Sequence, residues 1–119
     1  MIKGIGIDII ELKRIVNSMQ NKRFAERILT PAERVIYEGF KGEKRKAEYL
    51  AGRFAAKEAF AKAAGEGIGK LSFQDIEIIA DEKGAPKIKV ERYADRTVHV
   101  SITHTDDYAA AQVIIEDRN

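Results

Sequence analysis

Residues 2–10 alternate between isoleucine and small or acidic side chains. The isoleucines stand at positions 5, 7 and 9, and the other side carries Gly4, Gly6 and Asp8. A period of two residues is typical of a β-strand. Because glycine weakens the interior of a strand, the glycines indicate close approach of another backbone or of a ligand on the face that Asp8 shares. An edge strand with Asp8 in solvent accounts for the pattern equally well.

The pattern changes to helical spacing from Glu11 onward. The apolar positions of this segment form one stripe, made of Leu12, Ile15, Val16 and Met19. This spacing predicts a helix, and residues 24–29 continue an amphipathic turn. Thr30, Pro31 and Glu33 then supply an N-cap, a proline at the first helical position and a capping-box glutamate. A new helix is therefore expected from Thr30 until the glycines at 39 and 42 interrupt it.

The longest helical segment runs from about Glu43 to Ala64 and is rich in alanine, lysine and glutamate. Gly65 is placed as a left-handed stop at its C-terminus. Alanines at 47, 51, 55 and 59 leave room for another element to pack closely against this helix. Glu58 and Lys62 stand four residues apart, so their side chains stack along the helix surface. An ordinary exposed ion pair also explains their spacing.

The remainder of the chain is predicted to be rich in strands. They are expected at 73–80, 87–91, 97–103 and 108–115, with turns at 82–86 and at His104–Asp107. The order of elements predicts an α+β fold in which helices cover one face of an antiparallel sheet. No linker or internal repeat is visible, so residues 1–119 are interpreted as a single domain.

Composition narrows the possible chemistry. The 119 residues include no cysteine, which excludes disulfides, thiolate catalysis and iron–sulfur clusters. Hydrophobic residues make up 45% and charged residues 34%, as in globular proteins. No apolar run reaches the roughly 20 residues that span a bilayer, and the amino terminus does not look like a signal peptide. A cytoplasmic location and no membrane partner are therefore expected.

Positive charge is concentrated in the first half of the chain. Residues 11–27 hold five basic and two acidic side chains, and residues 41–62 hold seven and three. Such a distribution suits an anionic ligand, an acidic protein or a phosphate backbone. A solvated charged surface explains it too, since the net charge is only +2.

Three motifs, in order along the chain, narrow the choice. They are GIDIIE at 6–11 followed by Arg14 and Ile15, FAAKEA at 54–59 followed by Lys62, Ala63 and Gly65, and SITHT at 101–105. Together they resemble the holo-acyl-carrier-protein synthase family, the small bacterial 4′-phosphopantetheinyl transferases. Residues 24–33 also look like the connecting segment of that family. The resemblance covers almost the whole chain, whereas any one motif would be a weak signal.

The resemblance implies transfer of the phosphopantetheine arm of coenzyme A to a serine of apo acyl carrier protein, in support of fatty acid biosynthesis, with release of adenosine 3′,5′-bisphosphate. Asp8 and Glu58 match the Mg²⁺ ligands of the family, and hard carboxylates suit that ion. Lys62, one turn beyond Glu58, would stabilise the phosphate charge or the leaving group. Glu58 acting directly, or a metal-bound water, is the candidate base for the serine proton, and the sequence leaves both open.

The resemblance also implies a trimer of identical subunits with active sites between them. The candidates for binding the nucleotide part of coenzyme A are Lys44, Arg45, Arg53, Gly65, His104 and Thr105. The candidates for docking the acidic carrier protein are Lys13, Arg14, Met19, Lys22, Arg23, Phe24 and Arg27. Glu66 adds a carboxylate near the expected phosphate path, where the family often has a small or hydroxyl residue.

One alternative lies in a different class. A non-catalytic basic α+β module that binds RNA or an acidic protein would leave Asp8 and Glu58 incidental. The sequence lacks the aromatic signature of common RNA-binding domains, so a nucleic-acid partner is not expected. The enzyme and the module differ in one testable respect, because only the enzyme would consume coenzyme A.

Overall fold

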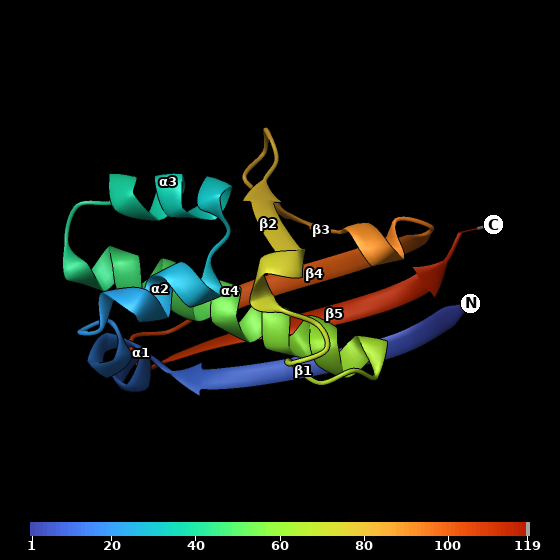
Figure 1. Cartoon of the computed structure of the whole chain (residues 1–119), viewed down its shortest axis with the longest axis horizontal. Helices are drawn as coiled ribbons and strands as arrows, with labels where there is room; N and C mark the ends of the chain where they lie inside the picture. The colour runs from blue at the N-terminus through green and yellow to red at the C-terminus, as the bar shows by residue number, and fades with distance from the viewer. Residues whose placement is uncertain (119) are drawn as a thin grey trace.

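The computed structural model describes residues 1–118 as an antiparallel sheet, a long helix across one of its faces, and a layer of shorter elements over that helix (Figure 1). The helices are α1 (Leu12–Ser18), α2 (Lys22–Ile28), α3 (Pro31–Gly39) and α4 (Glu43–Ala64), with the short 3-10 helices η1 (Phe73–Asp75) and η2 (Glu91–Tyr93). The strands are β1 (Ile2–Glu11), β2 (Ile76–Ala80), β3 (Pro86–Val90), β4 (Arg96–His104) and β5 (Tyr108–Asp117). The predicted α+β class is confirmed.

The main sheet has three antiparallel strands in the order β1-β5-β4. Asp8 pairs with Ala111 and Glu11 with Tyr108, while His104 at the end of β4 pairs with Ala109. Strands β2 and β3 form a separate antiparallel hairpin. Both β1 and β4 are therefore edge strands of the main sheet, and β5 separates them. Within residues 1–118, no helix has the length and apolarity needed to cross a membrane.

Helix α4 lies directly on β1 because the strand has no side chains at the points of contact. A Cβ atom added to Gly6 would lie 1.9 Å from the carbonyl oxygen of Ala59, and one added to Gly4 would lie 1.8 Å from that of Ala63. On the helix side, Ala55, Ala59 and Ala63 are buried. The close backbone approach expected from the glycines is confirmed, and it fixes the height of α4 above Asp8.

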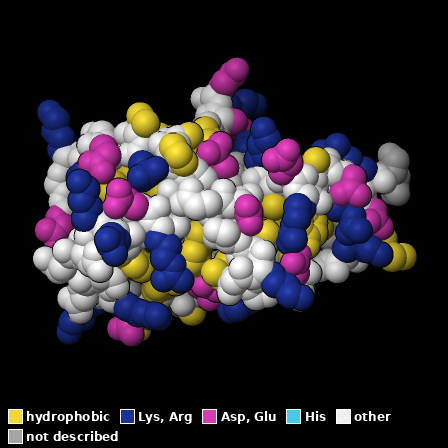
Figure 2. Space-filling view, in the orientation of Figure 1, with side chains coloured by type: hydrophobic (Ala, Val, Ile, Leu, Met, Phe, Trp, Pro, Cys, Tyr) yellow, Lys and Arg dark blue, Asp and Glu magenta, His cyan; other side chains and the backbone are white. Residues whose placement is uncertain are grey.

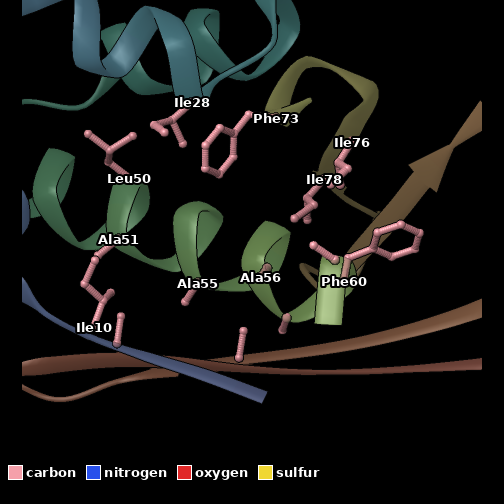
Figure 3. Close-up of a cluster of buried hydrophobic side chains, with 14 of the residues drawn as sticks. Ile10, Ile28, Leu50, Ala51, Ala55, Ala56, Phe60, Phe73, Ile76 and Ile78 are labelled. Carbon is pink, nitrogen blue, oxygen red and sulfur yellow. The ribbon is translucent and has the colours of Figure 1, made fainter. Parts of the chain in front are cut away.

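The opposite side of α4 is covered by α2, η1 and β2. Ile28, Phe73, Ile76 and Ile78 point down toward the helix in Figure 3, and all four are buried. Helix α4 is thus enclosed between the sheet and this upper layer, which is why half of its 22 residues are buried. The predicted helix 43–64 and its left-handed Gly65 stop, with φ 72°, are confirmed.

The structure differs from the sequence prediction at both 3-10 helices. Glu91 was expected to end the strand 87–91 but begins η2. Residues 73–80 were expected to form one strand, but only Ile76–Ala80 do so, and Phe73–Asp75 form η1. The Ser72 hydroxyl accepts a hydrogen bond from the Gln74 amide, and the Asp75 carboxylate accepts one from the Ser72 amide, so a capping box starts a helical turn here. The capping box predicted at Thr30 and Glu33 is present at the start of α3.

Candidate active site

Asp8 and Lys62 meet where α4 crosses β1. Asp8 lies on the same face of β1 as Gly4 and Gly6, and its side chain points toward α4 with 18% of its surface exposed. The Lys62 ammonium donates to Asp8 Oδ1 at 3.1 Å and to the carbonyl oxygen of Ile7 at 2.9 Å. The expected helix-surface pair between Glu58 and Lys62 is not among the ion pairs of residues 1–118, because Lys62 turns to the strand instead.

Glu58 completes this group one turn before Lys62. Burial raises the pKa of the Glu58 carboxyl, and the negative charge of Asp8 raises it further. Three cations, Lys62, Arg14 and Arg27, act in the opposite direction and lower that pKa. Two carboxylates that repel each other in a partly buried position form a site that a divalent cation would stabilise.

The donor set suits Mg²⁺ bound together with a substrate. Within residues 1–118, no cluster of three or more His, Cys, Asp or Glu side chains is available to hold a metal ion. Mg²⁺ commonly binds through one or two carboxylates and takes its other ligands from water and substrate phosphates. Asp8 and Glu58 fit that pattern, whereas a structural zinc site would need more protein ligands.

A groove of about 320 Å³ opens beside Glu58. Its walls come from α1, α2, α4 and η1, and its lining includes Arg14, Phe24, Arg27, Phe54, Glu58 and Phe73. Phe54 stacks between Phe24 and Phe73, with ring centroids 6.2 Å and 5.6 Å away. The guanidinium of Arg27 lies 5.7 Å above the ring of Phe73. The groove therefore has an aromatic floor and a basic rim that leads to Glu58, and we call it the aromatic groove.

The aromatic groove contains part of the expected docking set. Arg14, Phe24 and Arg27 line it. Lys13 instead lines a separate pocket with Lys44, and Met19 lines another pocket with Gln20 and Lys46. Lys22 and Arg23 are exposed at the start of α2. Figure 2 shows apolar surface among Lys and Arg side chains in the region of α1 and α2.

A second pocket of about 320 Å³ collects three of the nucleotide candidates. Arg45, Arg53 and His104 line it. The Arg53 guanidinium stacks 4.2 Å above the ring of Tyr49 and donates to the carbonyl oxygen of Ile78 at 3.4 Å. His104 Nδ1 lies 3.7 Å from Glu48 Oε2. We call this the basic pocket.

Three other nucleotide candidates lie outside the basic pocket. Lys44 pairs with Asp106 at 3.3 Å. The Thr105 hydroxyl accepts hydrogen bonds from the amides of Asp107 and Tyr108 and so stabilises the turn between β4 and β5. Gly65 caps α4. The roles of these residues toward a ligand stay predictions.

The carboxylate site and the basic pocket lie on opposite flanks of α4. Asp8 belongs to β1, whereas His104 and Ile102 of the basic pocket belong to β4, at the other edge of the sheet. Helix α4 presents Glu58 and Lys62 toward β1, and it presents Gly52 toward Ile102 of β4. A single chain therefore does not bring the two halves of the expected site together.

Glu66 does not extend toward the carboxylate site. It accepts two hydrogen bonds of 2.7 Å from Arg92 and one from the Tyr93 hydroxyl. The Tyr93 hydrogen bond and the Arg92 contact lower the pKa of Glu66. Glu66 thereby links the C-terminal end of α4 to η2. Its carboxylate is occupied by these bonds and is not free to extend along the expected phosphate path.

Sequence reasoning did not identify every residue that shapes the site. Phe54 stands four residues before Glu58 on α4, so helical spacing was a usable signal that the two share a face. Phe73 and Ile68 reach the aromatic groove only through tertiary packing. The same holds for a buried ion pair between Lys57 and Glu33, in which Nζ lies 2.6 Å from Oε1 and both side chains are 0% exposed.

Comparison with known proteins identifies the family of this chain. Residues 4–113 match the model of the 4′-phosphopantetheinyl transferase superfamily, and the chain therefore belongs to that superfamily. Within it, the chain groups with the holo-[acyl-carrier-protein] synthases. It is 62% identical to that enzyme of Bacillus subtilis strain 168 over 118 residues, which cover 98% of this chain and 97% of the relative. The expected family and the assignment as a phosphopantetheinyl transferase are confirmed.

Solved structures give the same result. A holo-(acyl-carrier-protein) synthase of Bacillus anthracis strain Ames, in complex with CoA (3′,5′-ADP), matches with a TM-score of 0.92, 50% identity and 99% coverage of both chains. The Helicobacter pylori enzyme in complex with coenzyme A matches with a TM-score of 0.82 and 38% identity, over 94% of this chain and 99% of that one. The enzyme class favours catalysis over the non-catalytic binding module.

Proposed function

We propose that this enzyme transfers the 4′-phosphopantetheine group of coenzyme A to a serine hydroxyl of an apo acyl carrier protein, with Mg²⁺, and releases adenosine 3′,5′-bisphosphate. In this transfer the serine oxygen bonds to the β-phosphorus of the diphosphate, and the bond from that phosphorus to the bridging oxygen breaks. The observation that carries the proposal is the meeting of Asp8, Glu58 and Lys62 beside the aromatic groove. Supply of carrier for fatty acid biosynthesis is part of the proposal, and so is a cytoplasmic location.

Asp8 and Glu58 are the proposed Mg²⁺ ligands. When bound, the ion would neutralise negative charge on the diphosphate and help to orient it. The ammonium of Lys62, held by Asp8 and the Ile7 carbonyl, stabilises charge on the leaving phosphate. We propose that the serine proton passes to the Glu58 carboxylate, either directly or through a metal-bound water.

The aromatic groove is the proposed docking surface for the carrier. Phe24, Phe54 and Phe73 offer an apolar floor, and Arg14 and Arg27 add positive charge for an acidic partner. The groove ends at Glu58, so a serine presented there arrives at the carboxylate site. Lys13, Lys22 and Arg23 would contribute to long-range attraction because they are exposed on α1 and α2. Met19 is proposed as an apolar contact at the edge of the surface.

We further propose a homotrimer with sites between subunits. The sheet face away from α4 exposes Ile5, Ile7 and Ile9, at 61%, 64% and 64%. A stripe of exposed isoleucines on a sheet is typical of a surface that another subunit covers. Assembly through this face would place β1 of one subunit near β4 of the next, joining the carboxylate site to a neighbour's basic pocket. Arg45, Arg53 and His104 would then bind the nucleotide phosphates.

The direct test is incubation of the purified protein with coenzyme A, Mg²⁺ and an apo acyl carrier protein, followed by mass spectrometry of the carrier. The proposal predicts a gain of one phosphopantetheine group, together with stoichiometric adenosine 3′,5′-bisphosphate. Omission of Mg²⁺ in the presence of a chelator is expected to prevent the gain. If several carriers stay unmodified under conditions in which the Bacillus subtilis enzyme modifies them, the proposed reaction is wrong.

A further inference from the structure

The C-terminus of α2 is held by side chains from two other elements. The Gln74 amide nitrogen lies 3.0 Å from the carbonyl oxygen of Glu26, 3.1 Å from that of Arg27 and 2.8 Å from that of Leu29. The carbonyl oxygen of Ile28, which lies between those of Arg27 and Leu29 in the chain, accepts a hydrogen bond from Lys57 Nζ at 2.7 Å. Helix ends leave their last carbonyl groups without partners inside the helix. Here two side chains cover four consecutive carbonyls.

Both of these side chains are themselves anchored. Lys57 also donates to Glu33 Oε1 at 2.6 Å and to the Phe73 carbonyl at 3.1 Å, so its three donors all have acceptors. Glu33 accepts in turn from the Thr30 amide at 2.8 Å and from the Ile78 amide at 2.7 Å. Gln74 belongs to η1, whose first residue Phe73 is buried. Helix α2 is thus attached to α4 and to η1.

These bonds matter for α2 because the helix is short. It is seven residues long, Ile28 is its only fully buried residue, and Phe24 and Ala25 are partly buried against the core. Isolated helices of this length do not hold their shape in water. Yet α2 carries Phe24 and Arg27, and both line the aromatic groove. The direction of their side chains therefore depends on what fixes the end of α2.

We propose that Gln74 is a positioning residue for carrier recognition, acting with Lys57 to hold α2 so that Phe24 and Arg27 face the aromatic groove. This inference rests on the proposed docking surface. Gln74 does not line the groove and contacts no reacting group, so its effect passes through α2. The nucleotide part of coenzyme A is proposed to bind in the basic pocket on the other flank of α4, and its diphosphate at Asp8 and Glu58, and Gln74 contacts neither place. Binding of coenzyme A is therefore expected to be independent of Gln74.

The test compares steady-state kinetics of Gln74→Ala and Gln74→Glu with the unaltered enzyme. Glutamate has the shape of glutamine but cannot donate to the three carbonyls when ionised. Gln74 is exposed, so both variants keep the buried core. We expect the KM for apo carrier to rise about fivefold or more in both, while kcat and the KM for coenzyme A change less than about twofold. Tyr93→Phe removes the hydrogen bond from the Tyr93 hydroxyl to Glu66, just beyond the C-terminus of α4, and is expected to change neither KM.

Arg27→Glu separates failure of this inference from failure of the docking surface. If Arg27→Glu raises the carrier KM and the Gln74 variants leave it unchanged, the docking surface stands and the positioning role of Gln74 is overturned. Equal increases in both KM values for Gln74→Ala also overturn it, because they indicate a general loss of structure. If Arg27→Glu leaves the carrier KM unchanged as well, the docking surface itself is wrong.

Discussion

Lys62 Nζ lies 3.1 Å from Asp8 Oδ1, across the contact between α4 and β1. Lys62 is more than half exposed, at 54%, and ion pairs of this kind contribute only about 0–1 kcal/mol to stability. A contribution to the stability of the fold therefore explains this ion pair poorly. It is better explained by the proposed function, in which Lys62 is a cation held in place beside Asp8, a proposed Mg²⁺ ligand.

Substitution Lys62→Met should separate activity from stability. Without the ammonium, the leaving phosphate loses a charged partner, and we expect kcat to fall by about 100-fold or more. The free energy of unfolding, measured by urea denaturation, should change by less than about 1 kcal/mol. Near-normal turnover in Lys62→Met would remove this residue from the mechanism.

Substitution Gly6→Ala should damage the contact between β1 and α4. The new methyl group would lie 1.9 Å from the Ala59 carbonyl oxygen, so strand and helix must separate. Overpacking of this kind costs about 1–3 kcal/mol, and thermal denaturation would measure it. Gly39→Ala is the matched control, because no atom lies within 4 Å of its added Cβ. Equal stability of the two variants would contradict the packing described here.

Substitution Glu33→Gln should destabilise the fold, because it leaves the buried Lys57 ammonium without a counter-charge. Burial lowers the pKa of the Lys57 ammonium, and Glu33 opposes that shift. Without the Glu33 carboxylate, no anion offsets the burial of the Lys57 ammonium. We expect the free energy of unfolding to fall by about 3–5 kcal/mol. The double variant with Lys57→Met should recover part of it. Glu38→Gln, on the exposed side of α3, should change stability by less than about 0.5 kcal/mol. A similarly small loss for Glu33→Gln would show that the buried pair is not a strong constraint.

Mixing two inactive variants would test the site between subunits. Glu58→Gln impairs the carboxylate site and Arg45→Glu impairs the basic pocket, which lie on opposite flanks of α4. With equal co-expression and random assembly, roughly one site in four over all trimers would combine two intact halves, so activity should return to about that fraction. In the control mixture, one chain carries Glu58→Gln and the other carries Lys62→Met. Both substitutions impair the carboxylate site, so no site has two intact halves and the mixture should stay inactive. Absence of recovery in the first mixture would place the whole site within one chain.

Local signals were sufficient for most of the fold. The capping box at Thr30, the alanine-rich helix and its Gly65 stop are short-range features, and each lies where the sequence predicts it. The short helix η1 was predicted as the start of a strand, although Phe73 is its one apolar residue and is out of phase with the alternation of β2. Its capping box at Ser72 and Asp75 was a usable signal.

The arrangement of the site depended more on tertiary structure. The resemblance to a family selected Asp8, Glu58 and Lys62, but spacing alone paired Lys62 with Glu58 rather than with Asp8. The Lys57–Glu33 pair joins residues 24 positions apart and leaves no periodic signal. The exposure of Ile5, Ile7 and Ile9 follows from the glycines on the other face, which let α4 approach there.

The dependence of turnover on Mg²⁺ concentration tests the central claim most directly. If Asp8 and Glu58 hold the ion, Asp8→Asn should raise the Mg²⁺ concentration for half-maximal activity by about tenfold or more, because one of two protein ligands loses its charge. Glu58→Gln should show little activity at any concentration, while Glu38→Gln should follow the curve of the unaltered enzyme. An Asp8→Asn variant with an unchanged Mg²⁺ curve would contradict the assignment of these carboxylates as the metal site.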